Sequence, residues 1–334
     1  MLTRRRFSAS LAAGLAAMPE WAAAQSLNDR LNGDVSPVHD PCIIKAAGLY
    51  HVFCTSQMRA GKGLIHWRTS PDLATWTFKG AVMPAFPDWV MAAVPEARGA
   101  WAPDISFSAG QYRLYYAAST FGKNQSVIGL MTTPTLDTND PAFGWKDEGL
   151  VVASRPGDDF NAIDPNAVVD SHSRQYLSFG SFWSGIKLIA LDPATGKPSD
   201  GAKPLAIAAR PKPGAVEAPF IVQRNGVYYL FASFDLCCKG VDSSYYTVVG
   251  RAKAATGPYV DRDGIAMLNG GGSVVLRAKD GDRWKGPGHC AVLEDEGRHL
   301  IVYHAYDTDN GGKPALRIQV LQWTHDGWPV IAKA

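Results

Sequence analysis

The chain has 334 residues, of which 46% are hydrophobic and 19% are charged, and it contains 33 glycines and 22 prolines. Its charged fraction lies below the roughly 25% of typical soluble domains and its glycine and proline content is high, which excludes extended disorder and a long helical bundle. The formal net charge is +2, and no basic run follows the N-terminus. We therefore expect neither nucleic acid nor a membrane surface as a partner.

Residues 1–24 are predicted to be an export signal. Arg4, Arg5 and Arg6 precede an Ala- and Leu-rich run and three alanines at residues 22–24, which is the order of a basic start, an apolar stretch and a small-residue cleavage site. The arginines followed by Phe7 resemble a twin-arginine signal, which exports folded proteins. Without this segment, 30 basic and 30 acidic residues remain. We expect a periplasmic or extracellular protein, and the alternative of a membrane anchor is disfavoured by the short apolar run.

Cysteine usage leaves two interpretations open. The chain has five cysteines, at positions 42, 54, 237, 238 and 290. The odd number argues against a complete disulfide framework, and no CxxC spacing suggests zinc. A disulfide between the adjacent Cys237 and Cys238 is conceivable in an exported protein, but buried free thiols are the favoured interpretation.

Five segments share a turn residue, an alternating aromatic and aliphatic run, and then small or hydroxyl residues, and each predicts a strand. In chain order they are residues 48–56, 110–119, 174–181, 226–233 and 297–305. A shorter predicted strand, opened by an acid, a histidine or a proline, precedes each of them, at residues 40–44, 102–106, 164–168, 217–221 and 287–292. Further strands are expected after each pair, at residues 63–70, 126–132, 186–191, 246–253 and 316–323.

These groups of strands recur about every sixty residues along the chain. Three or four antiparallel strands per repeat of this length are typical of a propeller blade. Five repeats account for the chain after the signal, so the predicted fold class is all-β, with residues 25–334 forming a single five-bladed β-propeller domain. A two-sheet sandwich is the competing architecture, and it gives no reason for proline-flanked strand starts at recurring spacings.

Three acids stand at similar places in the repeats. Asp40, Asp164 and Glu217 each lie one or two residues before a proline at the start of a predicted inner strand. Because the inner strands of a propeller line its central channel, we expect the three carboxylates to converge at one end of it. Repulsion between them raises at least one pKa, which lets a protonated acid and an ionised base coexist. Hydrolysis of a glycosidic bond requires such a pair, and a wide separation goes with inversion.

Five motifs, in this order along the chain, resemble those of glycoside hydrolase family 43. They are Val38-His39-Asp40-Pro41, Trp101-Ala102-Pro103-Asp104, Ala162-Ile163-Asp164-Pro165-Asn166, Val216-Glu217-Ala218-Pro219-Phe220 and Gly286-Pro287-Gly288-His289. The resemblance runs from about residue 34 to residue 330. Together with residues 233–240 and 321–329, the motifs look most like those of the family's endo-acting arabinanases, which cleave α-1,5-linked L-arabinan.

The resemblance implies an inverting glycosidase in which Asp40 is the general base, Glu217 is the general acid and Asp164 holds and tunes the acid. It also implies a metal ion, usually calcium, near His289 and bound mostly through water. Cys290 stands where the family often has a polar residue, so this motif departs from the common form. An exo-acting α-L-arabinofuranosidase, a β-xylosidase of the same fold and a non-catalytic glycan-binding propeller are the alternatives.

Contacts with a sugar are expected from residues beside these motifs. Flat aromatic rings pack against the apolar faces of sugars, and His39 is placed to hydrogen-bond a hydroxyl group. The predicted substrate-binding residues are His39, Trp101, Phe121, Asn166, Ser181 and Trp183. Asp104 and His304 are expected to lie outside catalysis. We expect a monomer that acts on arabinan or arabino-oligosaccharides.

Overall fold

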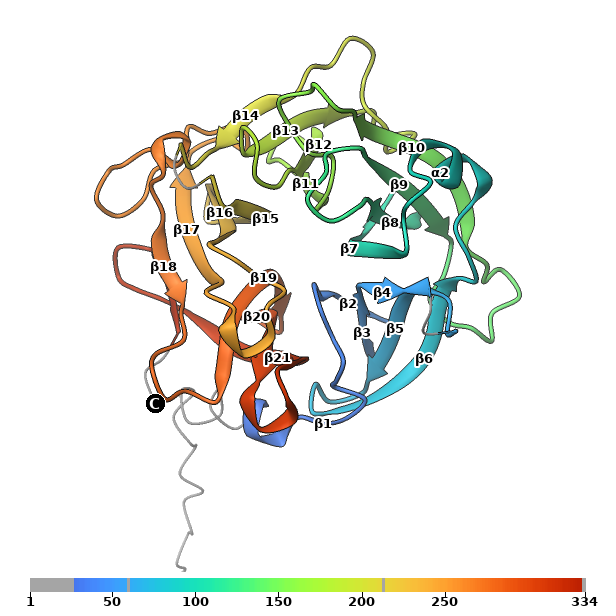
Figure 1. Ribbon diagram of the computed structural model, residues 1–334, viewed down its shortest axis with the longest axis horizontal. Helices are drawn as coiled ribbons and strands as arrows, with labels where there is room; N and C mark the ends of the chain where they lie inside the picture. The colour runs from blue at the N-terminus through green and yellow to red at the C-terminus, as the bar shows by residue number, and fades with distance from the viewer. Residues whose placement is uncertain (1–26, 59–60, 212–213, 332–334) are drawn as a thin grey trace, which may run out of the picture.

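The computed structural model describes residues 27–331, apart from residues 59–60 and 212–213. Five antiparallel sheets surround a central channel as the blades of a β-propeller (Figure 1). The predicted fold class is therefore confirmed. The predicted export signal at residues 1–24 lies outside the described residues. In the described part of the chain, no helix is long and apolar enough to cross a membrane.

Apart from two short edge strands in the first two blades, each blade is built from one continuous stretch of chain, and its strands follow one another outward from the channel. The first two blades contain β2 (Cys42–Ala46), β3 (Leu49–Cys54), β5 (Leu64–Ser70) and β6 (Thr75–Met83), then β7 (Gly99–Ser108), β8 (Gln111–Ala118), β9 (Ser126–Thr133) and β10 (Lys146–Ser154). Two short strands extend them, since β1 (Asn32–Gly33) pairs with β6 and β4 (Ser56–Gln57) pairs with β7.

The other three blades follow the same order. They contain β11 (Asn166–Val169), β12 (Gln175–Phe179), β13 (Ile186–Leu191) and β14 (Leu205–Ala208); β15 (Val216–Arg224), β16 (Val227–Phe234), β17 (Tyr246–Ala252) and β18 (Ser273–Leu276); and β19 (Trp284–Asp295), β20 (Arg298–Asp307), β21 (Lys313–Trp323) and β22 (Pro329–Ile331). The helical segments include α2 (Asp88–Ala93) and the 3-10 turns η2 (Gly240–Asp242), η3 (Met267–Asn269) and η4 (Thr308–Asn310).

The core lies between neighbouring blades, which explains why the middle strands gave the clearest sequence signal. Every residue of β9 is buried, and so is every residue of β20 except Arg298. A strand covered on both faces needs an almost continuous apolar run, whereas the partly exposed outer strand β6 alternates. The predicted middle strands consequently match the observed ones within one or two residues at most ends.

The ring closes where the first blade meets the last. Backbone hydrogen bonds join Val38 N to Pro314 O at 3.1 Å and Leu316 N to Val35 O at 2.9 Å, so the segment that leads into β2 lies against β21. The buried carboxylate of Asp295, at the end of β19, accepts hydrogen bonds from Lys45 and Tyr50 of the first blade. These contacts hold two distant parts of the sequence in fixed register around the channel.

The cysteines fall into two groups. Cys42, Cys54 and Cys290 are buried and free, as expected. Cys237 and Cys238 are joined by a disulfide, so the preference for free thiols is wrong for this pair. The physical reason is that the pair lies in the loop after β16, where Cys238 is exposed and no core keeps a thiol out of reach of oxidation.

Candidate active site

Each inner strand has one non-glycine residue with a left-handed backbone conformation, either in its first half or just before it begins. These residues are Asp40 (φ 52°), Ala102 (φ 44°), Asp164 (φ 57°), Ala218 (φ 55°) and His289 (φ 49°). Non-glycine residues seldom adopt this conformation, and it concentrates at functional sites. The shared conformation aligns the blades and makes Ala102, rather than Asp104, the counterpart of Asp40. Asp104 therefore lies two residues beyond the position equivalent to Asp40.

Four of these five backbone N–H groups donate to a side chain of the preceding blade in the ring. The bonds are Asp40 N to His304 Nδ1 (3.1 Å), Ala102 N to Thr55 Oγ1 (2.8 Å), Ala218 N to Asp164 Oδ2 (3.0 Å) and His289 N to Ser233 Oγ (2.9 Å). Because each bond crosses from one blade to the next, the residues at the channel mouth are held relative to one another rather than only to their own strands.

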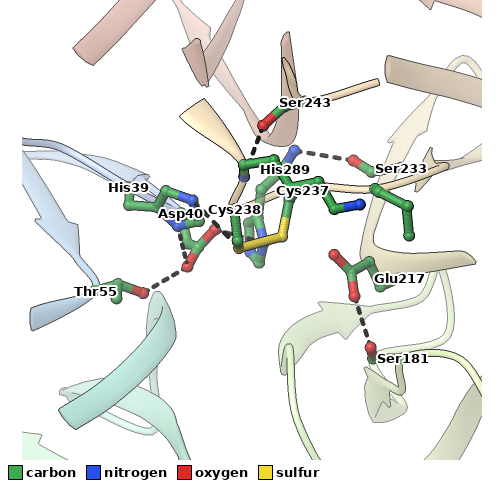
Figure 2. Close-up of a disulfide and its surroundings, with 12 residues drawn as sticks. His39, Asp40, Thr55, Ser181, Glu217, Ser233, Cys237, Cys238, Ser243 and His289 are labelled. Carbon is green, nitrogen blue, oxygen red and sulfur yellow. Dashed lines mark hydrogen bonds and ion pairs between the residues drawn. A yellow bond between two sulfur atoms is a disulfide. The ribbon is translucent and has the colours of Figure 1, made fainter. Parts of the chain in front are cut away.

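Asp40 lies in a buried cluster of donors (Figure 2). Its Oδ2 is 2.8 Å from His39 Nδ1 and accepts a 2.6 Å hydrogen bond from Thr55, while its Oδ1 is 3.1 Å from His289 Nδ1. Burial raises the pKa of Asp40, but the charges and hydrogen bonds of His39 and His289 together lower it well below its usual value. Burial lowers the pKa of His289, but the charge and hydrogen bond of Asp40 and the charges of Asp164 and Glu217 together outweigh this and raise it to about 9. Asp40 is therefore ionised at neutral pH.

The net pKa shifts of Glu217 and Asp164, which lie in the same channel, are opposite to that of Asp40. Burial raises the pKa of Asp164 to about 8, and the charges of Glu217 and Asp40 contribute to the rise. Burial also raises the pKa of Glu217, although hydrogen bonds from Ser181 (2.6 Å to Oε2) and Tyr245 act against it. One carboxylate is thus kept ionised while two others favour the protonated form. Groups with opposite pKa shifts in one site are suited to general acid–base chemistry.

The comparisons with known proteins agree with this geometry. Residues 35–329 match the family described as glycosyl hydrolases family 43. The chain belongs to this family.

Individual relatives of this family 43 enzyme match nearly its whole length. It is 41% identical to extracellular endo-alpha-(1->5)-L-arabinanase 1 of Bacillus subtilis, over 96% of this chain and 95% of that protein. Among solved structures, a GH43 endo-arabinanase from Bacillus licheniformis has 44% identity and a TM-score of 0.82 over 90% of this chain and 99% of that one. An exo-1,5-alpha-L-arabinanase from a bovine ruminal metagenomic library has 42% identity and a TM-score of 0.83 over 91% and 99%.

The predicted substrate-binding residues of the family 43 enzyme lie in three different environments. Phe121 and Trp183 are 77% and 43% exposed, in the loops after β8 and β12. Trp101 is half-buried and packs against a core cluster between blades. Asn166 and Ser181 are buried and bonded to the protein: Asn166 Oδ1 accepts from Ile221 N at 2.8 Å, and Ser181 donates to Glu217. The hydrogen bonds of Asn166 and Ser181 therefore position other parts of the site.

His39 and His304 both contact Asp40. Their rings stack with centroids 3.8 Å apart, and His39 Nε2 is 2.8 Å from the hydroxyl of Tyr306. His304, which we expected to lie outside catalysis, is completely buried against Asp40. Asp104 is also buried, and its Oδ2 accepts from Ala167 N at 2.8 Å in the inner strand of the next blade.

Sequence reasoning missed several residues that contact the acids, above all Thr55, Tyr245 and Tyr306. Thr55 belongs to the small or hydroxyl residues that end each middle strand, so the repeat itself contained a signal for it. For Tyr245 the sequence contains a weaker signal, the glycine at position 288. The Tyr245 ring packs against this glycine so closely that an added Cβ would lie 2.2 Å from it. Nothing in the pattern marked Tyr306, because it reads as one more aromatic residue of a middle strand.

The donor set near His289 fits a calcium ion only in a hydrated form. Calcium prefers six to eight oxygen ligands, whereas His289 offers imidazole nitrogens, of which Nδ1 is already bonded to Asp40. In the described part of the chain, the one group with metal-ligand geometry is His39, Asp40 and His304, whose donor atoms lie within 4.8 Å of one another. Two imidazoles do not favour calcium, but the buried carboxyls beside His289 suit a positive charge surrounded by water.

Proposed function

We propose that this enzyme hydrolyses α-1,5-linked L-arabinan at internal bonds, with inversion at the anomeric carbon. The observation that carries the proposal is the opposite pKa shift of Asp40 and Glu217 in one channel mouth. The substrate is supported by full-length relatives whose names specify α-1,5-L-arabinan or arabinanase activity. A glycan-binding propeller without activity would gain nothing from a buried cluster of acids that costs folding free energy.

In the proposed mechanism, the protonated Glu217 donates its proton to the glycosidic oxygen as the bond from that oxygen to the anomeric carbon breaks. Asp40 accepts a proton from a water molecule, whose oxygen attacks the anomeric carbon from the opposite face. Asp164 holds the backbone next to Glu217 through its 3.0 Å bond to Ala218 N. Burial and the charge of Asp40 favour the protonated form of the acid. The products are two shorter glycans, one with an inverted reducing end.

Exposed aromatic residues favour cleavage at internal bonds of the arabinan. Phe121 follows β8, whose Ala117 pairs with Trp101, and the neighbour of Trp183, Phe182, donates its N–H to Val216 O at 2.9 Å. Both exposed rings therefore lie at the end of the channel that holds the acids. Apolar ring surface at this face can stack on sugar units beyond those at the cleaved bond.

The size distribution of early products from linear arabinan tests the proposed function. An endo-acting enzyme releases a mixture of oligosaccharides and lowers the viscosity at small extents of hydrolysis. A single short product from the first minutes onward would instead establish exo action, the activity named for the ruminal enzyme. If neither arabinan nor aryl arabinosides were hydrolysed, the alternative of a non-catalytic glycan-binding propeller would remain.

We also propose that the protein is exported, as residues 1–24 predict. The Cys237–Cys238 disulfide supports this location, because disulfides persist in oxidising compartments and are rare in the cytosol. The name of the Bacillus subtilis relative includes the word extracellular. Fractionation of the producing cells into cytoplasm, periplasm and medium tests the proposal.

Ser181→Ala is expected to move the high-pH limb of the kcat/KM profile to higher pH. The Ser181 hydroxyl donates a hydrogen bond to Glu217 Oε2 and lowers the pKa of Glu217, so its loss makes ionisation of the acid harder. That limb reports proton loss from the acid in the free enzyme. Catalysis at the optimum should fall less than about tenfold, because the acid itself remains. Ser171→Ala, at an exposed turn, is the matched control, and a downward shift for Ser181→Ala would contradict the assignment.

The calcium ion is a further proposal, with water and Nε2 of His289 as its ligands. Because Nδ1 of His289 is bonded to Asp40 and the pKa of the ring is about 9, the ion would have to displace the proton on Nε2. When bound, calcium would supply positive charge beside the carboxyls and reduce their mutual repulsion. Wild-type protein dialysed against calcium should retain about one ion per chain and show a Tm that rises with calcium concentration. His289→Ala should retain none and show no such rise. Equal calcium content and equal Tm response in both proteins would remove His289 as the ligand.

A further inference from the structure

The Cys237–Cys238 disulfide lies at the mouth of the channel, and the proposed mechanism gives it no role. Figure 2 shows Cys238 beside His39 and Asp40, and its Sγ is 3.9 Å from His39 Nε2. Cys238 is exposed and has a left-handed backbone with φ 68°. A non-glycine residue in this conformation needs surrounding structure to hold it, and here the covalent bond to its neighbour restricts the loop.

A continuous chain of hydrogen bonds leads from Cys238 to Asp40. The backbone N–H of Cys238 donates to the hydroxyl oxygen of Tyr306 at 2.8 Å. The same hydroxyl is 2.8 Å from His39 Nε2, and His39 Nδ1 is 2.8 Å from Asp40 Oδ2. The residues of this chain come from the loop after β16, from β20 and from the segment before β2, so only the folded ring assembles it.

The N–H of Cys238 sets the direction of this chain. A backbone N–H can only donate, so the Tyr306 oxygen is the acceptor in that bond. Burial raises the pKa of Tyr306, so its hydroxyl keeps its proton, which can be donated to His39 Nε2. In the neutral form of His39 the ring proton then lies on Nδ1, and this N–H donates to Asp40 Oδ2. In the other tautomer, Nδ1 would present a lone pair to the carboxylate and repel it.

We propose that the Cys237–Cys238 disulfide is a positioning element for Asp40. It holds the Cys238 N–H against Tyr306, and through Tyr306 and His39 it fixes the donor that orients the carboxylate. The proposal rests on the assignment of Asp40 as the general base. In this role the disulfide orients the base and does not bind the sugar, so its loss should affect kcat rather than substrate binding.

Thiol titration establishes the redox state first. Protein denatured without reductant should show the three free thiols of Cys42, Cys54 and Cys290, and two more after reduction. Five thiols before reduction would overturn the proposal, because the native loop would then contain no disulfide.

Reduction of the folded wild-type enzyme with a phosphine is the main test. We expect kcat on linear arabinan to fall about tenfold, in the range seen when a partner of an active-site group is removed, while KM changes less than about twofold. Reoxidation should restore kcat, and the Cys237→Ala/Cys238→Ala double variant should be slow and insensitive to reductant. An increase in KM at constant kcat would overturn the proposal and make the disulfide a sugar contact.

Tyr306→Phe tests whether the effect passes through the chain of hydrogen bonds. This variant removes the hydroxyl that links Cys238 to His39, so it should lose kcat to a similar extent, and reduction should then have no further effect. Tyr229→Phe, whose hydroxyl bonds to Gly327 far from the acids, should keep wild-type kcat and wild-type sensitivity to reductant. If Tyr306→Phe and reduction each lowered kcat independently, so that their fold-losses multiplied, the proposal would be overturned.

The tautomer of His39 provides a second measurement. It should change on reduction only if the disulfide acts through the chain of hydrogen bonds. The imidazole ¹⁵N shifts should report a protonated Nδ1 in the oxidised enzyme and a changed proton distribution after reduction, with an unchanged far-UV circular dichroism spectrum. An oxidised enzyme that cleaves arabinan but keeps the same kcat and His39 signals after reduction would refute this inference alone. An oxidised enzyme without any arabinan activity would refute the proposed function.

Discussion

Glu217→Gln is expected to lower kcat/KM on linear arabinan by about 10²- to 10⁴-fold, the contribution typical of a positioned general acid. The amide keeps the size of the side chain and can still bond to Ser181, but it has no transferable proton. A sugar alkoxide is a poor leaving group and needs that proton as the bond breaks. An aryl arabinoside with an acidic leaving group needs it much less, so its rate should fall far less. Steady-state kinetics on both substrates make the measurement.

Two controls make this prediction specific. Glu294→Gln is the same replacement at an exposed position of an inner strand, and it should leave both activities unchanged. Binding of arabino-oligosaccharides to Glu217→Gln, measured by calorimetry, should stay close to wild type, because only the proton donor is removed. Equal losses on the natural and the aryl substrate would argue that Glu217 is not the general acid.

Asp40→Asn is expected to lower kcat by about 10³-fold or more on every substrate, since a good leaving group does not replace the activation of water. Added azide needs no base and can attack from the face where water attacks, so it should restore part of the rate. The product is expected to be a sugar azide of inverted configuration relative to the substrate, identified by NMR. Asp200→Asn, at an exposed position, is the matched control.

The outcome for Asp40→Asn also bears on the folded state. The charge and hydrogen bond of Asp40 contribute most to the raised pKa of His289, which burial alone would lower, so the variant should shift His289 toward its neutral form. Thermal unfolding must therefore be measured beside activity, to separate lost catalysis from lost structure. An azide product of retained configuration would exclude attack from the proposed water face and with it the assignment of Asp40.

The comparison of sequence and structure is most informative at the inner strands. The acids at 40, 164 and 217 and the histidine at 289 could be located from the sequence, because each lies near the start of a strand in a repeat and within two residues of a proline. The register between blades could not be located in this way. Asp104 and Ala102 both stand beside Pro103, and only the left-handed backbone of Ala102 shows which one corresponds to Asp40.

The sequence by itself determined the five-bladed propeller, the family and the set of acids, since burial on both strand faces and the entry of each inner strand impose local patterns of residues. The tertiary structure alone decided what surrounds each acid. Tyr306 lies 267 positions from its partner His39, and Ser181 lies 36 positions from Glu217. Such contacts arise only when the blades close into a ring, and no local pattern records them. The opposite pKa shifts of Asp40 and Glu217 depend on this burial and these partners, so the proposed division of roles between the carboxylates depends on the closed ring.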